Sequence, residues 1–327
     1  MAYGSPVRRQ TARILLALIY ISTYPFILSG CTKPSIKDAR YDPAANILEI
    51  IAVLRRHIPD DTYQFEPARD FTGRNVYRAS LLRLENFEAI NSGLLRSGYM
   101  MDAIAFSKGR ALERLRAFDL ASEQYKQAAR YEGELQIEAL KSAALCDAFA
   151  EAAELEVSSS SVDNRFSSAN RREFTKVDQR RALLETLGKE VQDTHYESVL
   201  NEEMERTDSM EARRLESFRR TEASGNLKAI AARQQLVIRH RGSKNANRHL
   251  LALADLYATL AHEYIEEHPP ESLKFEPANF EELDRSAARL YEAVSNQDGA
   301  IERIEAAQRL ESFLAFTLRV DRDRFTP

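Results

Sequence analysis

Apolar side chains recur three and four residues apart along most of this chain, which places them on one face of an α-helix. Ile47, Ile50, Ile51 and Leu54 form the first such face, within an expected helix at residues 44–57. The same spacing predicts further helices at residues 76–91, 178–192, 197–223 and 301–320. The 327 residues include only 11 Gly and 10 Pro, about half the usual share, so the turns that a β-sandwich or barrel needs are scarce. We therefore expect an all-α fold.

The chain starts with a different pattern. Three arginines precede an uncharged run at residues 14–28, and the small residues Ser29 and Gly30 and then Cys31 follow it. Positive charge, an apolar run and small residues, in that order, are typical of a secretory leader. A transmembrane helix needs about 20 apolar residues, whereas this run is shorter and contains Pro25.

The end of the leader resembles the processing box of bacterial lipoproteins, in which Leu, a small residue and Gly or Ala precede Cys. The corresponding residues here are Leu28, Ser29, Gly30 and Cys31. The resemblance implies that a signal peptide at residues 1–30 is cleaved and that Cys31 carries a diacylglycerol thioether and an acylated amine. Burial of three fatty chains of ordinary length in the bilayer would stabilise membrane attachment by on the order of 30 kcal/mol, so the anchorage would be permanent.

The residue after the expected lipidated cysteine bears on localisation. Thr32 is not Asp, and by the sorting rule of enteric-type lipoproteins this implies the outer membrane, facing the periplasm. Residues 31–43 contain two prolines and several charges, which is typical of a tether. At about 3.3 Å per extended residue, the tether would keep the folded part within about 40 Å of the bilayer.

Two amphipathic segments at residues 102–133, separated near Arg116, carry the most informative pattern. They resemble a tetratricopeptide (TPR) repeat, which has small residues at its eighth and twentieth positions, an aromatic at the twenty-fourth and Ala at the twenty-seventh. The matching residues are Gly109, Ala121, Tyr125 and Ala128, and the pattern departs from the family at Ala105, Lys108 and Gly133. The resemblance implies that the small residues let two helices approach closely and that Tyr125 and Ala128 dock against the next helix.

A second candidate repeat lies downstream. Its first helix is expected around residues 253–260, and Ala287 and Tyr291 reproduce the second-helix spacing, with an insertion of about eighteen residues between the two. The helix at residues 301–320 would cap this repeat. Residues 157–177 are rich in Ser and poor in apolar side chains, so we expect a linker there. The expected architecture is a TPR-like solenoid of helical hairpins, with an N-terminal half at residues 44–156 and a C-terminal half at residues 178–327.

Charge argues against nucleic acid as a partner. The net charge is −4 with 46 basic and 50 acidic residues, and removal of three leader arginines brings it to about −7. Residues 211–248 are the exception, because they hold ten basic and three acidic residues. Such a stretch near a membrane is suited to phosphate headgroups or an acidic partner, or is simply a solvated face.

The sequence offers few residues for catalysis. The six His are scattered, the pair His262 and His268 does not have metalloprotease spacing, and there is no Gly-rich phosphate loop or nucleophile elbow. Leu-Glu-Ser-Phe at residues 215–218 and 310–313 resembles the catalytic segment of lysozyme-like transglycosylases, but the Gly-Leu-Met-Gln-type segment of those enzymes is missing. Cys146 lies on an apolar stripe and is expected to be a small core residue rather than a reactive thiol. We expect no enzymatic activity, no cofactor and no metal site.

The TPR resemblance also implies a binding surface. The concave positions of the first helix correspond here to Phe106, Arg110, Glu113 and Arg114. Because Arg grips carboxylates in bidentate fashion, this face is predicted to hold an acidic or C-terminal peptide, the alternative being a solvated face without a ligand.

Two functions remain. The first is a membrane-anchored scaffold that binds a protein or peptide partner in the bacterial envelope. The second is a ligand-binding lipoprotein that presents a small molecule to a transporter. An enclosed apolar pocket lined by aromatic side chains would favour the second, and an open groove the first. Aromatic residues make up 9% of the chain and Trp is absent, so the sequence favours the scaffold.

Overall fold

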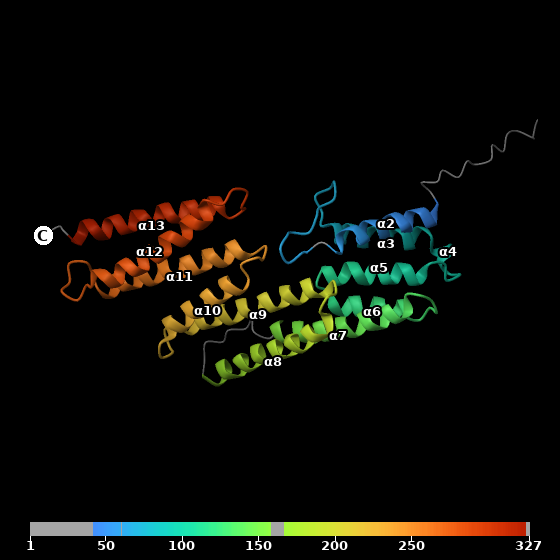
Figure 1. Cartoon of the computed structure of the whole chain (residues 1–327), viewed down its shortest axis with the longest axis horizontal. Helices are drawn as coiled ribbons and strands as arrows, with labels where there is room; N and C mark the ends of the chain where they lie inside the picture. The colour runs from blue at the N-terminus through green and yellow to red at the C-terminus, as the bar shows by residue number, and fades with distance from the viewer. Residues whose placement is uncertain (1–41, 60, 158–166, 325–327) are drawn as a thin grey trace, which may run out of the picture. The chain divides into compact units, whose positions relative to one another are not determined.

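The computed structural model describes residues 42–59, 61–157 and 167–324 (Figure 1). The leader, Cys31 and most of the tether lie outside these residues. Within them the fold is all-helical, as predicted, and the β-structure there is an isolated bridge between Arg69 and Asn75. None of the helices in the described ranges combines the length and the apolarity needed to cross a bilayer.

The helices fall into an earlier and a later series. The earlier series comprises α2 (Pro43–His57), α3 (Val76–Ile90), α4 (Ser92–Leu95), α5 (Met101–Arg114), α6 (Phe118–Ala128) and α7 (Gln136–Val157). The later series comprises α8 (Ser167–Val191), α9 (Tyr196–Phe218), α10 (Gly225–Arg239), α11 (Ala246–Glu267), α12 (Pro277–Ser295) and α13 (Arg303–Arg324). The chain divides within α2 into two compact units, Met1–Glu49 and Ile50–Pro327, and everything described below belongs to the second.

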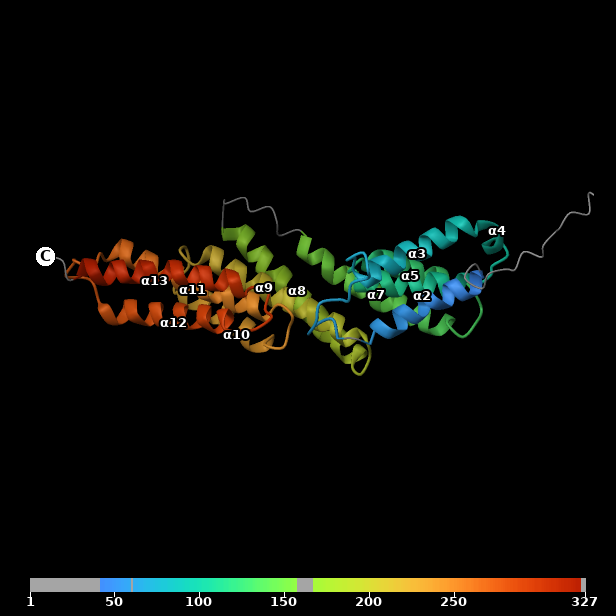
Figure 2. The ribbon, with the colours of Figure 1, turned by 90° about the horizontal axis from the view of Figure 1, so that it is seen from above.

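From α5 to α13, each helix packs against the helix that follows it in the sequence. Figures 1 and 2 show this for α11, α12 and α13, which run side by side in both views. Two apolar clusters are largest. One contains Phe118, Phe149 and Tyr196 among the helices α5 to α9, and the other contains Phe280 and Phe313 among the helices α11 to α13.

The hairpin of α5 and α6 depends on a close approach at Gly109. A Cβ atom at this position would lie 2.7 Å from a ring carbon of Tyr125, which is less than real Cβ contacts show. Ala121, Tyr125 and Ala128 are completely buried beside it. Ala287 and Tyr291 are also buried, on α12, so all six positions that the sequence assigns to helix packing are inside the fold.

The turn between α5 and α6 has an unusual residue in a left-handed conformation. Arg116 has φ +63°, its N–H donates to the Glu113 carbonyl over 3.1 Å, and the N–H of Ala117 donates to the Leu112 carbonyl over 3.0 Å. This is the Schellman pattern that ends many helices, with Arg where Gly is usual. A side chain in this conformation costs on the order of 1 kcal/mol, and here it directs the Arg116 guanidinium towards buried carboxylates of other helices.

Three expectations for the later half need correction. Residues 158–166 of the expected linker lie outside the described residues, but residues 167–177 are the first turns of α8. The helix expected at residues 197–223 ends at Phe218, and a separate helix, α10, follows it within the basic stretch. Most of the expected eighteen-residue insertion is helical, since α11 continues to Glu267 and α12 starts at Pro277.

Candidate functional site

The four side chains predicted to bind a peptide are used in contacts within the chain. Arg110 lies over the rings of Phe106 and Tyr196, with its guanidinium carbon 4.9 and 5.6 Å from the ring centroids. Glu113 is fully buried, accepts a hydrogen bond of 2.7 Å from the Tyr125 hydroxyl and lies 3.3 Å from Arg110. Burial would raise the pKa of Glu113, but Arg110 and the neighbouring hydrogen-bond donors outweigh it and lower the pKa to about 2.

Arg114, the fourth of these side chains, ties two other segments to α5. One of its terminal nitrogens donates to the hydroxyls of Thr62 and Ser198 over 2.9 and 2.7 Å. The other donates to the carbonyls of Ile58 and His195 over 2.8 and 3.2 Å. The loop after α2 and the start of α9 therefore cover the face that the sequence assigned to a partner, and a peptide would have to displace them. The helical spacing identified the face but not the segments that return to cover it.

An open groove with a volume of about 740 Å³ lies beyond Arg114. It is bounded by the loop after α2, the turn between α5 and α6, the helices α9 and α10, and the start of α11. Its seven basic side chains are Arg114, Arg116, Arg206, Arg213, Arg233, Lys244 and Arg248. Its four acidic side chains are Glu66, Glu156, Glu202 and Glu205. We call this surface the arginine groove.

A buried ionic cluster lies beside the arginine groove and shares Arg116 and Glu156 with its lining. Glu203 is 1% exposed, and its carboxylate accepts hydrogen bonds from Arg116 over 2.6 and 2.9 Å and from Arg180 over 2.5 Å. Arg180 is completely buried and also donates to the hydroxyl of Thr207 over 2.8 Å. Glu156 completes the cluster by pairing with both arginines. These contacts join the turn after α5 to the helices α7, α8 and α9, and so fix the shape of the groove.

The wall of the groove near Tyr63 is held by contacts between residues far apart in the sequence. The Tyr63 hydroxyl lies 2.8 Å from His240 Nδ1, and His240 Nε2 lies 3.0 Å from an Asp208 carboxylate oxygen. Lys244 donates from its side chain to Glu202 and to the Thr62 carbonyl, both over 2.8 Å. Burial and nearby carboxylates raise the pKa of Tyr63 to about 12, so this hydroxyl is not an activated nucleophile despite its geometry.

Glu205 is likewise satisfied by its neighbours in the wall. It accepts hydrogen bonds from Ser243 over 2.5 Å and from Asn245 over 3.3 Å, and His249 Nε2 lies 2.6 Å away. Burial alone would raise the pKa of Glu205, but His249 and Ser243 lower it. This carboxylate therefore stays ionised and is held by these donors rather than by the arginines of the groove.

Three arginines of the groove keep hydrogen-bonding capacity. Arg206 is 47% exposed and Arg248 is 59% exposed, and Arg213 is exposed as well. The Nε of Arg206 lies 3.6 Å from Glu203. The Nε of Arg213 donates to the Ser209 carbonyl over 3.3 Å, and the Nε of Arg248 donates to Glu302 over 3.0 Å. Their terminal nitrogens make no hydrogen bond or ion pair with the described residues. A site of this kind can bind anions, and carboxylates in particular.

The basic stretch at residues 211–248 was the sequence signal for this site. It contains Arg213, Arg233, Lys244 and Arg248, all of which line the groove. Arg206 was missed because Asp208 and Glu211 separate it from that stretch and dilute its charge. In the described part of the chain, no group of three or more His, Cys, Asp or Glu side chains is placed to share a metal ion.

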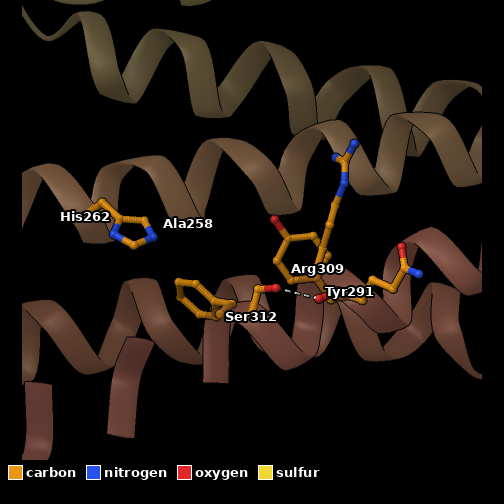
Figure 3. A pocket seen from close by; sticks show the side chains of 7 residues that line it. Ala258, His262, Tyr291, Arg309 and Ser312 are labelled. Carbon is orange, nitrogen blue, oxygen red and sulfur yellow. Dashed lines mark hydrogen bonds between the residues drawn. The ribbon is translucent and has the colours of Figure 1, made fainter. Parts of the chain in front are cut away.

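A smaller pocket of about 310 Å³ lies among α11, α12 and α13 (Figure 3). Three of its polar side chains make hydrogen bonds or ion pairs within the chain. Tyr291 donates to Asp255 over 2.6 Å, Arg309 pairs with Asp255 and Glu305, and Ser312 donates to the Gln308 carbonyl over 2.9 Å. The His262 ring stacks 3.7 Å from that of Phe316, and burial lowers the pKa of His262. This pocket thus presents fewer unused polar groups than the arginine groove.

The expected role of Cys146 agrees with its surroundings. The thiol is free and completely buried, and burial, with a smaller effect from Glu113, raises its pKa. A buried thiol that resists ionisation is a packing residue rather than a nucleophile. Leu28, Ser29, Gly30 and Cys31 lie outside the described residues.

No protein-family model matches this chain, and neither a curated protein nor a solved structure matches it.

Proposed function

We propose that this chain is a protein-binding scaffold of the bacterial envelope, anchored to the outer membrane through acyl groups on Cys31 and facing the periplasm. The arginine groove is the surface that receives the partner. The observation that carries the proposal is the groove itself: it is open, it shares Arg116 and Glu156 with a cluster of paired buried charges, and three of its arginines have donors to spare. The proposed role is assembly or anchoring, without catalysis or a cofactor.

The proposed architecture is a TPR-like solenoid. The successive packing of α5 to α13 and the tight contact between Gly109 and Tyr125 support it. Helical-repeat proteins of this kind contact mainly their sequence neighbours and offer long concave surfaces to partners. The lipoprotein box at residues 28–31 supports the anchor.

The alternative function, a lipoprotein that presents a small molecule to a transporter, is supported by the pocket in Figure 3, which contains the aromatic rings of Tyr291 and Phe313. We favour the scaffold because Tyr291, Arg309 and Ser312 of that pocket are engaged within the chain, whereas three arginines of the groove keep unused donors.

Photo-crosslinking in intact cells tests the scaffold. A benzophenone amino acid replaces Ser209, which lines the groove, and in a matched control it replaces Ser286, which is similarly half-buried on α12 but lines neither the groove nor the pocket. We expect a discrete crosslinked protein from position 209 and not from position 286. Equal or absent crosslinks at the two positions would contradict a partner in the groove.

A further inference from the structure

The three open arginines of the groove have a defined spacing. Arg206 and Arg213 are seven residues apart on α9, so they lie on one helical face about 10.5 Å apart along the axis. Both line the groove, and Arg248 adds a third open guanidinium from α11. The groove therefore presents a row of two cations and a third from a neighbouring helix.

An extended polypeptide matches this spacing. In a polyproline II conformation, residues three apart lie on the same face about 9.3 Å from each other. Two acidic side chains at such positions can reach Arg206 and Arg213 together. Arg binds a carboxylate through two parallel N–H donors, and the terminal nitrogens of these arginines have such donors available.

The lining of the groove favours a polypeptide over a lipid. Its apolar side chains are Pro67, Leu115 and Ala252, which are too few to cover acyl chains. Polar neighbours such as Thr62, Asn75 and Ser209 are suited to a peptide backbone. Of the four acidic side chains of the groove, Glu156 pairs with Arg116 and Arg180, and Glu202 pairs with Lys244. The seven basic side chains therefore leave an excess of positive charge along the groove.

We infer that the groove binds an acidic segment of the partner in an extended conformation, with carboxylates three residues apart on Arg206 and Arg213 and another on Arg248. This inference rests on the proposed function and names the chemistry of its partner. Because the arginines are partly exposed, binding weakens as salt rises.

Fluorescence anisotropy tests the inference on the purified full-length protein in a nonionic detergent. The probe is a labelled (Glu-Pro-Pro)4 peptide, and (Gln-Pro-Pro)4 has the same backbone without the charge. We expect the Glu peptide to bind and the Gln peptide not to bind. The R206Q/R213Q/R248Q variant should bind the Glu peptide at least about tenfold more weakly, a loss of about 1.4 kcal/mol.

A matched variant separates the site from net charge. R285Q/R303Q/R322Q removes the same three charges from side chains that are 66, 52 and 71% exposed and lie outside the groove. It should change the affinity less than about twofold. Equal losses in the two variants, or equal binding of the Glu and Gln peptides, would overturn the inference. All six arginines are partly exposed, so circular dichroism should show the same helix content in both variants.

Competing anions and the crosslinking experiment in cells distinguish the inference from its alternatives. Tighter groove-dependent binding of oligothymidylate, or of phosphatidylglycerol in micelles of the same detergent, would overturn the assignment to an acidic polypeptide. Crosslinks from position 209 without peptide binding would agree with the scaffold function but contradict an acidic partner. Peptide binding without crosslinks would contradict the scaffold function but agree with the inferred binding of acidic peptides by the groove.

Discussion

Two regions of this protein are built from similar pairs of helices but held together by different chemistry. Among α5 to α9, charges are buried: Glu113, Arg180 and Glu203 are each at most 2% exposed. Among α11 to α13, aromatic rings take this place, with Phe313 and Phe316 at 6.0 Å and Tyr291 and Phe313 at 6.2 Å between ring centroids. We call these the ionic region and the aromatic region.

The difference shows why the candidate site lies where it does. Apolar burial stabilises in proportion to area and has little directional preference, whereas a buried ion pair persists only if its partners are correctly placed. Arg116 and Arg180 both converge on Glu203, so the helices that carry them are held in one arrangement. The arginine groove lies beside this cluster.

Acid should affect the ionic region most, and this is the largest effect we expect. The pKa of Glu113 and that of Asp208 are lowered to about 2, because their partners outweigh the burial that would raise them. A lowered folded-state pKa gives stability that is present above the unfolded value, near 4, and is lost as pH falls towards 2. In the aromatic region two effects oppose each other. Arg219 lowers the pKa of Glu263 on α11 to about 2, whereas burial raises the pKa of Asp284, so that protonation of Asp284 favours the folded state.

Tryptophan reporters can follow the two regions separately, because the chain has no Trp. F106W reports on the surroundings of Glu113, and F316W reports on the aromatic region, both at half-buried positions. During acid titration from pH 6 to 2, we expect the F106W transition at least about one pH unit above that of F316W. Coincident transitions would mean that the two regions unfold together.

Removal of the central carboxylate should be the next largest effect. In Glu203→Ala, Arg180 and Arg116 lose one of the two carboxylates that they share and keep only the half-buried Glu156, although Arg180 is completely buried. We expect the free energy of unfolding in urea to fall by about 3–5 kcal/mol. Phe313→Ala should cost a similar amount in the aromatic region through its cavity, about 3–5 kcal/mol.

The two losses should differ in how they can be repaired. Adding Arg180→Met to Glu203→Leu replaces a buried ion pair by apolar side chains, which is often neutral or stabilising. We expect this double variant to recover at least about half of the loss seen in Glu203→Ala, measured by the same urea unfolding. A double variant no more stable than Glu203→Ala would argue against buried charge as the cause.

The smallest effect concerns the contact between α5 and α6. Gly109→Ala places a Cβ 2.7 Å from the Tyr125 ring, so we expect a loss of about 1–3 kcal/mol in the free energy of unfolding. Gly242→Ala is the control, because no heavy atom lies within 4 Å of its added Cβ and the change should stay within about 0.5 kcal/mol. Similar losses at both glycines would show that close packing at Gly109 is not the reason.

Much of the fold could be predicted from the sequence because helical spacing is local. The expected helices at residues 44–57 and 76–91 agree with α2 and α3 to within one residue at each end. Gly109 lies where α5 comes close to Tyr125 of α6. Helix α10 was missed because its apolar residues are not confined to one face: Leu227 and Ile238 are exposed, whereas Ala229 and Leu236 are buried.

The sequence by itself determined the helical class, the packing positions and the local excess of basic residues. Only the tertiary structure decided which arginines are engaged and which are open. Arg110 and Arg114 are covered by a loop and a helix from elsewhere in the chain, and Tyr63 meets His240 across 177 residues. Periodicity is read over windows of one or two dozen residues, whereas the environment of a charge depends on every segment that folds against it.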